Sequence, residues 1–389
     1  MTFRTLTALT LLLATFFVKA QTSQLRVNQN INLPKDSLER KQLISSLNDF
    51  LSAAQKPNEE NTLVLATEAV ETFILLDEIK EIEKSGKFKD DFFYKPYLTN
   101  ATPLKNNQYL LQISFIGINE NTAFLRANFE FIAHKANSTF FFSSPLARNT
   151  KTWKVEKSGN NIFHYQVSLN KAKIKAFNTL ASVFDKKLGV KNKVTEFYCC
   201  ENLNELQKLI GVEYKSDYNG KSDGVWSASS GDKKIVALGN DNASFNDFDP
   251  HDLWHDRLSL IIPRNQVNRS VDEGCAYIYG GSWGLSWKTI FEAFKEQVAS
   301  NKNTNWMEVK EKPVYFKTQK FSNVADQIVN ALLVKKIEKE KGFAGVWELL
   351  NCGKVEKGNE NYYKALEKIT GITKADYNEK VWELINNEI

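Results

Sequence analysis

Two histidines four residues apart, followed at a distance by a carboxylate, constrain the fold of this chain more than any other feature of its sequence. His251 and His255 stand in the stretch Asp-Pro-His-Asp-Leu-Trp-His-Asp-Arg-Leu, and seventeen residues separate His255 from Glu273. On an α-helix, side chains four residues apart lie on one face, about 40° from each other, so both imidazoles can reach one ion. Two imidazoles and a carboxylate are typical ligands of a catalytic zinc site, which keeps its fourth position open. The sequence therefore predicts a helix that carries both histidines and a zinc ion shared with Glu273.

The pattern resembles the HExxH zinc metallopeptidases of the MA clan, and within them the gluzincins. In the gluzincins the third zinc ligand is a Glu on a following helix, in an Asn/Asp-Glu-Gly-x-Ala setting. Here the corresponding residues read Asp-Glu-Gly-Cys-Ala from Asp272. The resemblance covers roughly residues 195–389. It implies a zinc-activated water that attacks a peptide or protein substrate, with His251, His255 and Glu273 as the metal ligands.

The chain departs from the family at Asp252, which stands where HExxH proteins have the Glu that acts as general base. An Asp carboxylate is one methylene shorter, and a misplacement of about 1 Å can reduce a rate about 100-fold. A second interpretation is that Asp252 serves the first turn of the helix, where a carboxylate is stabilised by the helix dipole. In that case the protein is a catalytically degenerate binding or scaffold protein on a peptidase fold. The sequence leaves both interpretations open.

Three charged residues near the motif are candidates for supporting roles. Asp256 is a candidate to orient a ligand imidazole, a role that metal sites commonly need. Asp272 is a further candidate carboxylate beside Glu273. Arg257 is a candidate to pair with Asp272, Glu273 or a substrate carboxylate, and its alternative is a surface salt bridge of little energetic value.

Aromatic residues near the motif allow no firm assignment. An oxyanion-stabilising side chain is usual in gluzincins, but the sequence offers no basis for choosing between Tyr277 and Tyr279. Trp254, Trp283 and Trp287 are expected to pack in the core more often than to line a cleft.

The N-terminus predicts export. Arg4 precedes the apolar run 6–18, and Val18-Lys19-Ala20 forms a small-residue cleavage site, as in a secretory signal peptide. That run is too short for a permanent membrane anchor, so we expect a protein that is soluble after leader removal and is secreted or periplasmic. The net charge of +5 is too small to indicate nucleic-acid binding. The four cysteines leave open one disulfide or buried thiols.

The periodicity of the chain predicts an α+β fold. After the leader (1–20) and a flexible lead-in (21–35), helices are expected at 37–55 and 61–84, followed by alternating strands from 109 to 167 and a helix at 169–189. These residues form a predicted accessory domain, 36–190. A strand, a helix and a hairpin then precede the histidine-bearing helix, and helices follow to the end, so 191–389 is predicted as a zincin-like domain with a helical C-terminal lobe. The resemblance also implies that strand 234–238 offers a free edge for an extended peptide.

Overall fold

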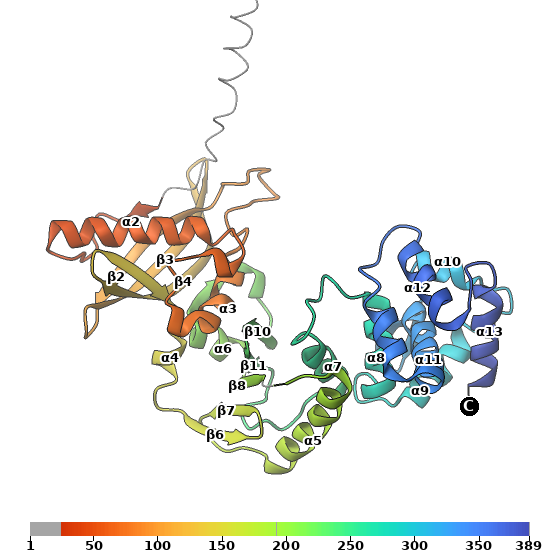
Figure 1. Cartoon of the computed structure of the whole chain (residues 1–389). Helices are drawn as coiled ribbons and strands as arrows, with labels where there is room; N and C mark the ends of the chain where they lie inside the picture. Colours follow the sequence, from red (N-terminus) through yellow and green to blue (C-terminus); the bar gives the residue numbers. More distant parts are fainter. Residues whose placement is uncertain (1–24, 192, 389) are drawn as a thin grey trace, which may run out of the picture. The chain divides into compact units, whose positions relative to one another are not determined.

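The computed structural model describes residues 25–191 and 193–388, and it is a mixed α+β structure (Figure 1). The predicted leader lies outside these residues. The chain forms two compact units, the first comprising Met1–Trp153, Cys200–Ser230 and Ile235–Asp241, and the second Lys154–Cys199, Gly231–Lys234 and Asn242–Ile389. The units therefore do not follow a single cut near residue 190, because the chain passes between them several times.

The first unit is built on an antiparallel meander whose alternation the sequence predicts. Its strands are β2 (Lys95–Pro103), β3 (Gln108–Asn119), β4 (Thr122–Ala136) and β5 (Thr139–Ser143), with β1 (Arg26–Val27) parallel to β2, and β9 (Val212–Lys215) also paired with β4. The inward positions of β3 and β4 are buried, as the period of two requires: Leu111, Ile113, Phe115, Ala127, Phe129 and Phe131. Strand β2 was not evident from sequence because a bulge between Leu98 and Asn100 breaks its alternation.

Helix α2 (Ser37–Ala53) lies against this sheet (Figure 1). Its Phe50 is fully buried, and the Phe50 ring packs on the rings of Phe131 and Phe142 at centroid distances of 5.3 and 4.7 Å. The second helix, α3 (Ala69–Ile79), is shorter than the predicted 61–84. The residues before it are held by β5, since Val64 bridges to Phe142 and the Leu65 N–H donates to the Phe142 carbonyl. The remaining elements of this unit are the 3-10 turns Asn58–Glu60, Ala66–Glu68 and Ser216–Tyr218, α4 (Leu146–Asn149), α6 (Leu203–Ile210) and β10 (Gly224–Ser230).

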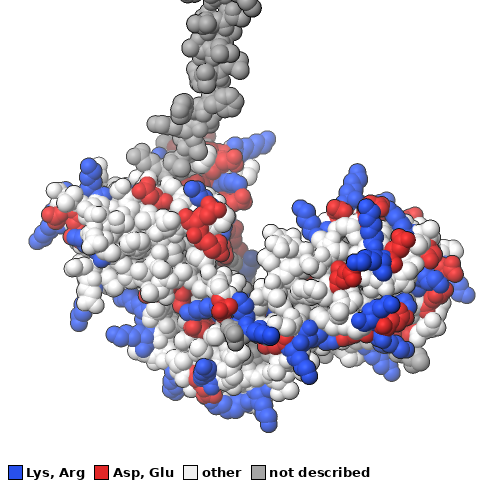
Figure 2. Space-filling model, viewed as in Figure 1, with Lys and Arg blue, Asp and Glu red and all other residues white. Residues whose placement is uncertain are grey.

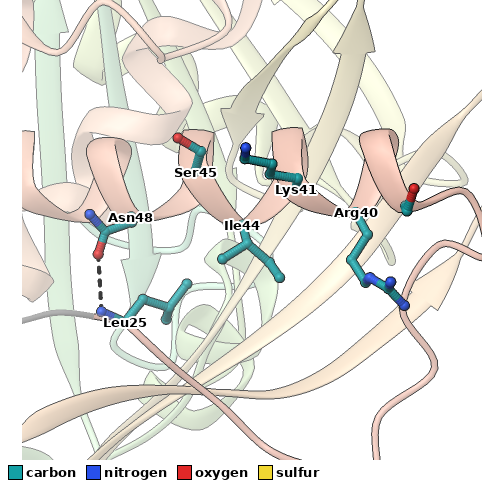
Figure 3. Close-up of a pocket in the computed structure, with 7 residues that line it drawn as sticks. Leu25, Arg40, Lys41, Ile44, Ser45 and Asn48 are labelled. Atoms are coloured by element: carbon teal, nitrogen blue, oxygen red, sulfur yellow. Dashed lines mark hydrogen bonds between the residues drawn. The ribbon is translucent and has the colours of Figure 1, made fainter.

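The N-terminal strand joins α2 around an open pocket of about 510 Å³ (Figure 3). The Leu25 N–H donates to Oδ1 of Asn48 at 3.0 Å, and the Leu25 side chain is buried. Seven residues line the pocket: Leu25, Ser37, Arg40, Lys41, Ile44, Ser45 and Asn48. The predicted lead-in, 21–35, thus contains a strand and a buried side chain.

The second sheet has the strand order β10-β11-β8-β7-β6. Strand β6 (Lys154–Ser158) is antiparallel to β7 (Asn161–Tyr165), which is parallel to β8 (Val194–Cys199), and α5 (Lys171–Leu188) connects β7 to β8. Strand β11 (Lys233–Gly239) lies between β10 and β8 in this order, and the Cys200 N–H donates to the Leu238 carbonyl at 2.8 Å. The expectation of a free edge at 234–238 is therefore wrong, because both edges of β11 are paired.

The C-terminal part of the second unit is mainly helical, as predicted (Figure 1). It contains α7 (Pro250–Leu258), α8 (Arg269–Gly280), α9 (Trp287–Gln297), α10 (Trp306–Glu311), α11 (Ala325–Leu350), α12 (Glu360–Thr370) and α13 (Tyr377–Asn387). Helix α11 merges two predicted helices across a kink at Gly342, whose φ is 68°. The hairpin of β12 (Tyr315–Thr318) and β13 (Phe321–Val324) was not predicted, because four-residue strands carry too little alternation.

Lysine, arginine and acidic side chains are interspersed over the visible face of the protein (Figure 2), in line with the small net charge. Among the described residues, no helix has the length and apolar character needed to span a bilayer. None of the four cysteines forms a disulfide: Cys199, Cys200 and Cys275 are buried, and Cys352 is partly buried.

Candidate metal centre

Helix α7 begins where local chemistry requires it to begin. Pro250 occupies the first turn, where its missing N–H costs nothing, and Oδ1 of Asp249 accepts a hydrogen bond from the His251 N–H at 2.9 Å. Leu253 and Trp254 are buried, and Trp254 faces α8, where its Nε1 donates to Asp272. His251 and His255 also lie on the face of α7 that meets α8, since both contact residues of that helix.

Helix α8 approaches its neighbours closely through two glycines. A Cβ at Gly280 would lie 2.5 Å from the backbone of Pro250 and His251, and a Cβ at Gly274 would lie 2.8 Å from the backbone of Asn330 and Ala331 in α11. The Glu-Gly-Cys-Ala stretch is thus part of α8, and its Gly274 allows the close contact with α11. Close contact of α8 with α7 brings the Glu273 carboxylate to the two imidazoles.

The three predicted ligands converge. One ligand atom from each of His251, His255 and Glu273 lies within 4.8 Å of the other two. His251 Nε2 is 3.2 Å from Glu273 Oε2, and His255 Nε2 is 3.7 Å from Glu273 Oε1. Ligand atoms about 2.0–2.1 Å from one tetrahedral zinc ion stand about 3.3 Å from one another. The spacing of these side chains therefore fits a zinc-sized ion between them.

Hydrogen bonds on the far side of each imidazole orient its Nε2 toward Glu273. His251 Nδ1 is 2.7 Å from the Gly281 carbonyl oxygen, and His255 Nδ1 is 2.8 Å from Asp272 Oδ1. Neither oxygen can donate a hydrogen, so each Nδ1 carries a proton, and any lone pair that a ring offers to a metal ion is at Nε2. Imidazoles held in this way are typical of metal ligands.

His255 Nε2 is the clearest sign that the cluster is built to hold a cation. It is buried and has no hydrogen-bond partner among residues 25–191 and 193–388. Its 3.7 Å separation from Glu273 Oε1 is too long for a direct hydrogen bond. Leaving a buried polar atom unpaired costs about 1–3 kcal/mol. A divalent cation, or protons on the imidazoles, would satisfy the lone pairs that point at Glu273.

Contacts between oppositely charged groups in the cluster shift their pKa values against the effect of burial. Burial alone would raise the pKa of Glu273, but its contacts with His251 and His255 hold that pKa well below its usual range. Burial alone would lower the pKa of His255, but contacts with Asp272 and Glu273 outweigh it and raise the pKa to about 9. Arg269, which sequence reasoning missed, pairs with both Asp272 and Glu273 from three and four residues away on α8. Its spacing on the helix was the only available signal.

Asp252 lies in the first turn of α7, where the helix dipole stabilises a carboxylate, but its side chain caps no backbone N–H among the described residues. The N-terminus of α7 is capped by Asp249, and the exposed Asp252 carboxylate forms no hydrogen bond or ion pair with any residue in the described part of the chain. Partial desolvation by the surrounding protein, with the nearby negative charge of Asp249, raises the pKa of Asp252. Its carboxylate is thus free to accept a proton.

The three supporting candidates have different places in the structure. Asp272 is buried against His255 and also accepts a hydrogen bond from Trp254 Nε1 at 3.1 Å. Asp256 does not contact a site histidine; its Oδ1 is 2.8 Å from Nζ of the buried Lys234. Arg257 pairs neither with Asp272 nor with Glu273. It is 4% exposed and forms a bidentate pair with Asp185 of α5, at 2.5 and 2.7 Å. Removing one partner of such a pair leaves the other charge uncompensated, which costs more than the loss of a surface bridge.

The nearby aromatic residues serve mainly as packing. The Trp254 ring is fully buried against Phe184 and Tyr279. The hydroxyls of Tyr277 and Tyr279 donate to Asn323 Oδ1 and Glu338 Oε2, so both are already engaged and neither is identified as an oxyanion stabiliser. Trp283, in contrast, is not buried in the core: it is 58% exposed.

Comparison with known proteins adds no assignment: no protein-family model matches the chain, and no curated protein matches it. The geometry of the cluster is therefore the basis for any statement about function.

Proposed function

We propose that His251, His255 and Glu273 bind zinc, and that the chain is an exported, gluzincin-like hydrolase of peptide bonds. The proposal rests on one observation: two imidazoles and one carboxylate converge, and each imidazole Nδ1 is already hydrogen-bonded. His255 Nε2, which faces the carboxylate, is buried and has no hydrogen-bond partner among the described residues. We also propose that the C-terminal region has a zincin-like fold and that its substrate is a peptide or protein. Three protein ligands leave room for a fourth, non-protein ligand.

The residues around the cluster suit general-base hydrolysis. Zinc in such a site acidifies a coordinated water and polarises a substrate carbonyl. Asp252 is the residue that takes the proton from the attacking water at its carboxylate, in the position of the family's Glu. Its exposed carboxylate is free of competing hydrogen bonds among the described residues, so it can accept that proton. Asp272 and the Gly281 carbonyl hold the two imidazoles in place.

A second candidate function is a catalytically degenerate, zinc-binding protein on a peptidase-like scaffold. The observation that favours it is the identity of residue 252, since the shorter Asp side chain draws the carboxylate back by about 1 Å. The two candidates share the metal site and differ only in whether a bond is cleaved.

The metal part of the proposal is tested by measuring bound zinc in purified protein by inductively coupled plasma mass spectrometry. We expect about one zinc per chain in the parent and a loss of bound zinc in His255→Ala and Glu273→Gln. His134→Gln is the matched control, because His134 lies in the first unit with Gln108 and Ser143 as partners. Equal zinc content in the parent and in His255→Ala would contradict the assignment.

The catalytic part is tested with a fluorescence-quenched peptide library on the zinc-loaded protein. A hydrolase that uses Asp252 loses activity in Asp252→Asn and retains it in His134→Gln. An inactive parent that gains activity as Asp252→Glu identifies a degenerate enzyme. A parent and Asp252→Asn of equal activity would remove Asp252 from the mechanism while leaving the zinc site intact.

A further inference from the structure

The second unit has an open groove of about 790 Å³ that shares part of its wall with the start of α7. The volume is within the range of about 300–1,000 Å³ typical of small-ligand sites. Its wall comes from α5, the segment that leads into α7, the turn after α8, and β13. The lining residues are Asn170, Ala172, Lys173, Ala176, Asp247, Phe248, Asp249, Pro250, Trp283, Gly284 and Phe321.

An aromatic platform is the most unusual feature of this groove. The Trp283 ring is 58% exposed, yet it lies flat on the Phe321 ring with a centroid distance of 4.8 Å and an interplanar angle of 4°. One side of this pair is thus packed, and the indole still presents a large area to solvent. Aromatic side chains favour such offset stacks, and an exposed indole can accept another flat ring.

The backbone holds Trp283 in place at an energetic cost. Its φ is +53°, a conformation that is rare for a bulky residue, and Gly281 and Gly284 on either side also have positive φ. Reciprocal backbone hydrogen bonds between Ser282 and Leu285, at 3.1 and 2.8 Å, close the turn. A strained turn that exposes a tryptophan gains nothing in burial, and strain of this kind is often associated with ligand contacts.

The groove is continuous with the candidate metal centre along the chain. Asp249 and Pro250 line it and are followed directly by His251, and the carbonyl of Gly281, two residues before Trp283, is the partner of His251 Nδ1 at 2.7 Å. One short turn therefore positions both a proposed metal ligand and the aromatic platform.

Among the charged residues that line the groove, Lys173 pairs with Asp247, and Asp249 leaves one negative charge without a cationic partner in the lining. Lys173 Nζ is 3.0 Å from Asp247 Oδ1, and the Asp249 carboxylate caps α7. The remaining wall is mostly apolar, with Ala172, Ala176, Phe248, Pro250 and the two stacked rings. An uncharged, flat occupant therefore complements this lining better than an anion.

We propose that the groove is a subsite for an uncharged aromatic side chain of a peptide, which stacks on Trp283 over Phe321. The inference rests on the proposed function in so far as that peptide is the hydrolase's substrate. It specifies the substrate class as peptides with an aromatic residue near the bond that is cleaved.

The test is ¹⁹F NMR on protein labelled with 5-fluorotryptophan, with the Trp283 signal assigned from its absence in Trp283→Phe. The probes are N-acetyl-Gly-Phe-Gly-amide and its Ala and Glu counterparts, each added with zinc and with a chelator. We expect a saturable shift of the Trp283 signal with the Phe peptide and binding that is about three- to tenfold weaker with the Ala peptide. The Trp287 signal is the internal control, since its indole N–H is bonded to Glu388 outside the groove.

Three results would overturn the inference. They are no shift of the Trp283 signal at millimolar Phe peptide, an equal shift with the Ala peptide, or a shift with the oligosaccharide chitohexaose but not with the Phe peptide. The last would assign the platform to carbohydrate. Phe321→Leu, which keeps an apolar residue under the indole, should weaken Phe-peptide binding. A shift of the Trp283 signal in a protein that binds no zinc would support the aromatic subsite and contradict the proposed hydrolase. Zinc-dependent peptide cleavage without a shift of the Trp283 signal would support the hydrolase and contradict the subsite.

Discussion

Oδ1 of Asp272 accepts a hydrogen bond from Nδ1 of His255 at 2.8 Å, across the contact between α7 and α8. The same oxygen accepts from Trp254 Nε1 at 3.1 Å, so the carboxylate is tied to the core of the second unit while it orients an imidazole. Asp272 immediately precedes Glu273, and one turn of α8 thus supplies both a proposed ligand and the partner of another.

The first prediction concerns this pair. Asp272→Asn keeps an oxygen that can accept from Trp254 but removes the negative charge beside His255. Because partners that orient metal ligands commonly contribute 10- to 100-fold to metal affinity, we expect zinc affinity to fall by about that factor, as measured by competition with a fluorescent chelator. Asp256→Asn is the control, since Asp256 contacts Lys234. A comparable loss in both variants would show that the effect is not specific to the imidazole.

The second prediction concerns the close approach of α8 to α11. Gly274→Ala would place a Cβ 2.8 Å from the backbone of Asn330 and Ala331, which cannot move without shifting α11. Overpacking of this kind costs about 1–3 kcal/mol, so we expect a loss of that size in the free energy of unfolding, measured with urea. Gly86→Ala is the control, because nothing lies within 4 Å of a Cβ there and its φ is not positive. Equal stability of Gly274→Ala and the parent would contradict the packing argument.

The third prediction concerns the buried pair of Arg257 and Asp185. Arg257→Met leaves the carboxylate without its bidentate partner, and breaking such a buried pair costs about 3–5 kcal/mol. Because Asp185 is 22% exposed and can recover some hydration, we expect the lower end of that range. Lys368→Met is the control, since Lys368 pairs with Glu348 at an exposed site where a bridge is worth about 0–1 kcal/mol. The two variants should differ clearly in chemical denaturation; similar losses would argue against a structural role for Arg257.

The fourth prediction is a pH dependence that arises from Glu196. Burial would raise its pKa, but hydrogen bonds and charge from His164 and Lys233 lower it from 4.5 to about 2. A carboxyl with a depressed folded-state pKa stabilises the fold fully above its unfolded pKa, and this contribution is lost as the pH falls from about 4.5 to about 2. The parent should therefore lose stability over this window.

The measurement for Glu196 is urea unfolding of the parent and Glu196→Gln at several pH values. The stability difference between them should be largest above pH 4.5 and should shrink toward pH 2, where the parent's carboxyl is protonated as well. Glu348→Gln, at an exposed pair, should show little such dependence. A parent-to-variant difference that stays constant across the window would contradict the shifted pKa.

Some of this architecture could be predicted because it is written in local patterns. The alternation in β3 and β4 is confirmed by buried side chains such as Ile113 and Phe129, since a strand presents alternate residues to its core. The cap at Asp249 and Pro250 could be read from sequence because it depends only on neighbouring residues. The spacing of His251, His255 and Glu273 likewise indicated that they could share an ion, and they do converge.

Other features depend on contacts between residues far apart in the chain, and only the tertiary structure decided them. Strand β9, which includes Lys215, pairs with β4, and β11 is paired along both of its edges. Neither pairing could be predicted, because the periodicity of a strand does not specify its hydrogen-bonding partners. Asp272, and not Asp256, is the partner of His255 because of the way α8 packs on α7. Arg257 likewise pairs with Asp185 of α5 because of how the helices pack. By itself the sequence determined which side chains could form a metal site and on which helices they lie. Their orientation, their partners and the aromatic platform at Trp283 required the packing of the folded chain, since side-chain contacts are set by distances in space and not by separation along the sequence.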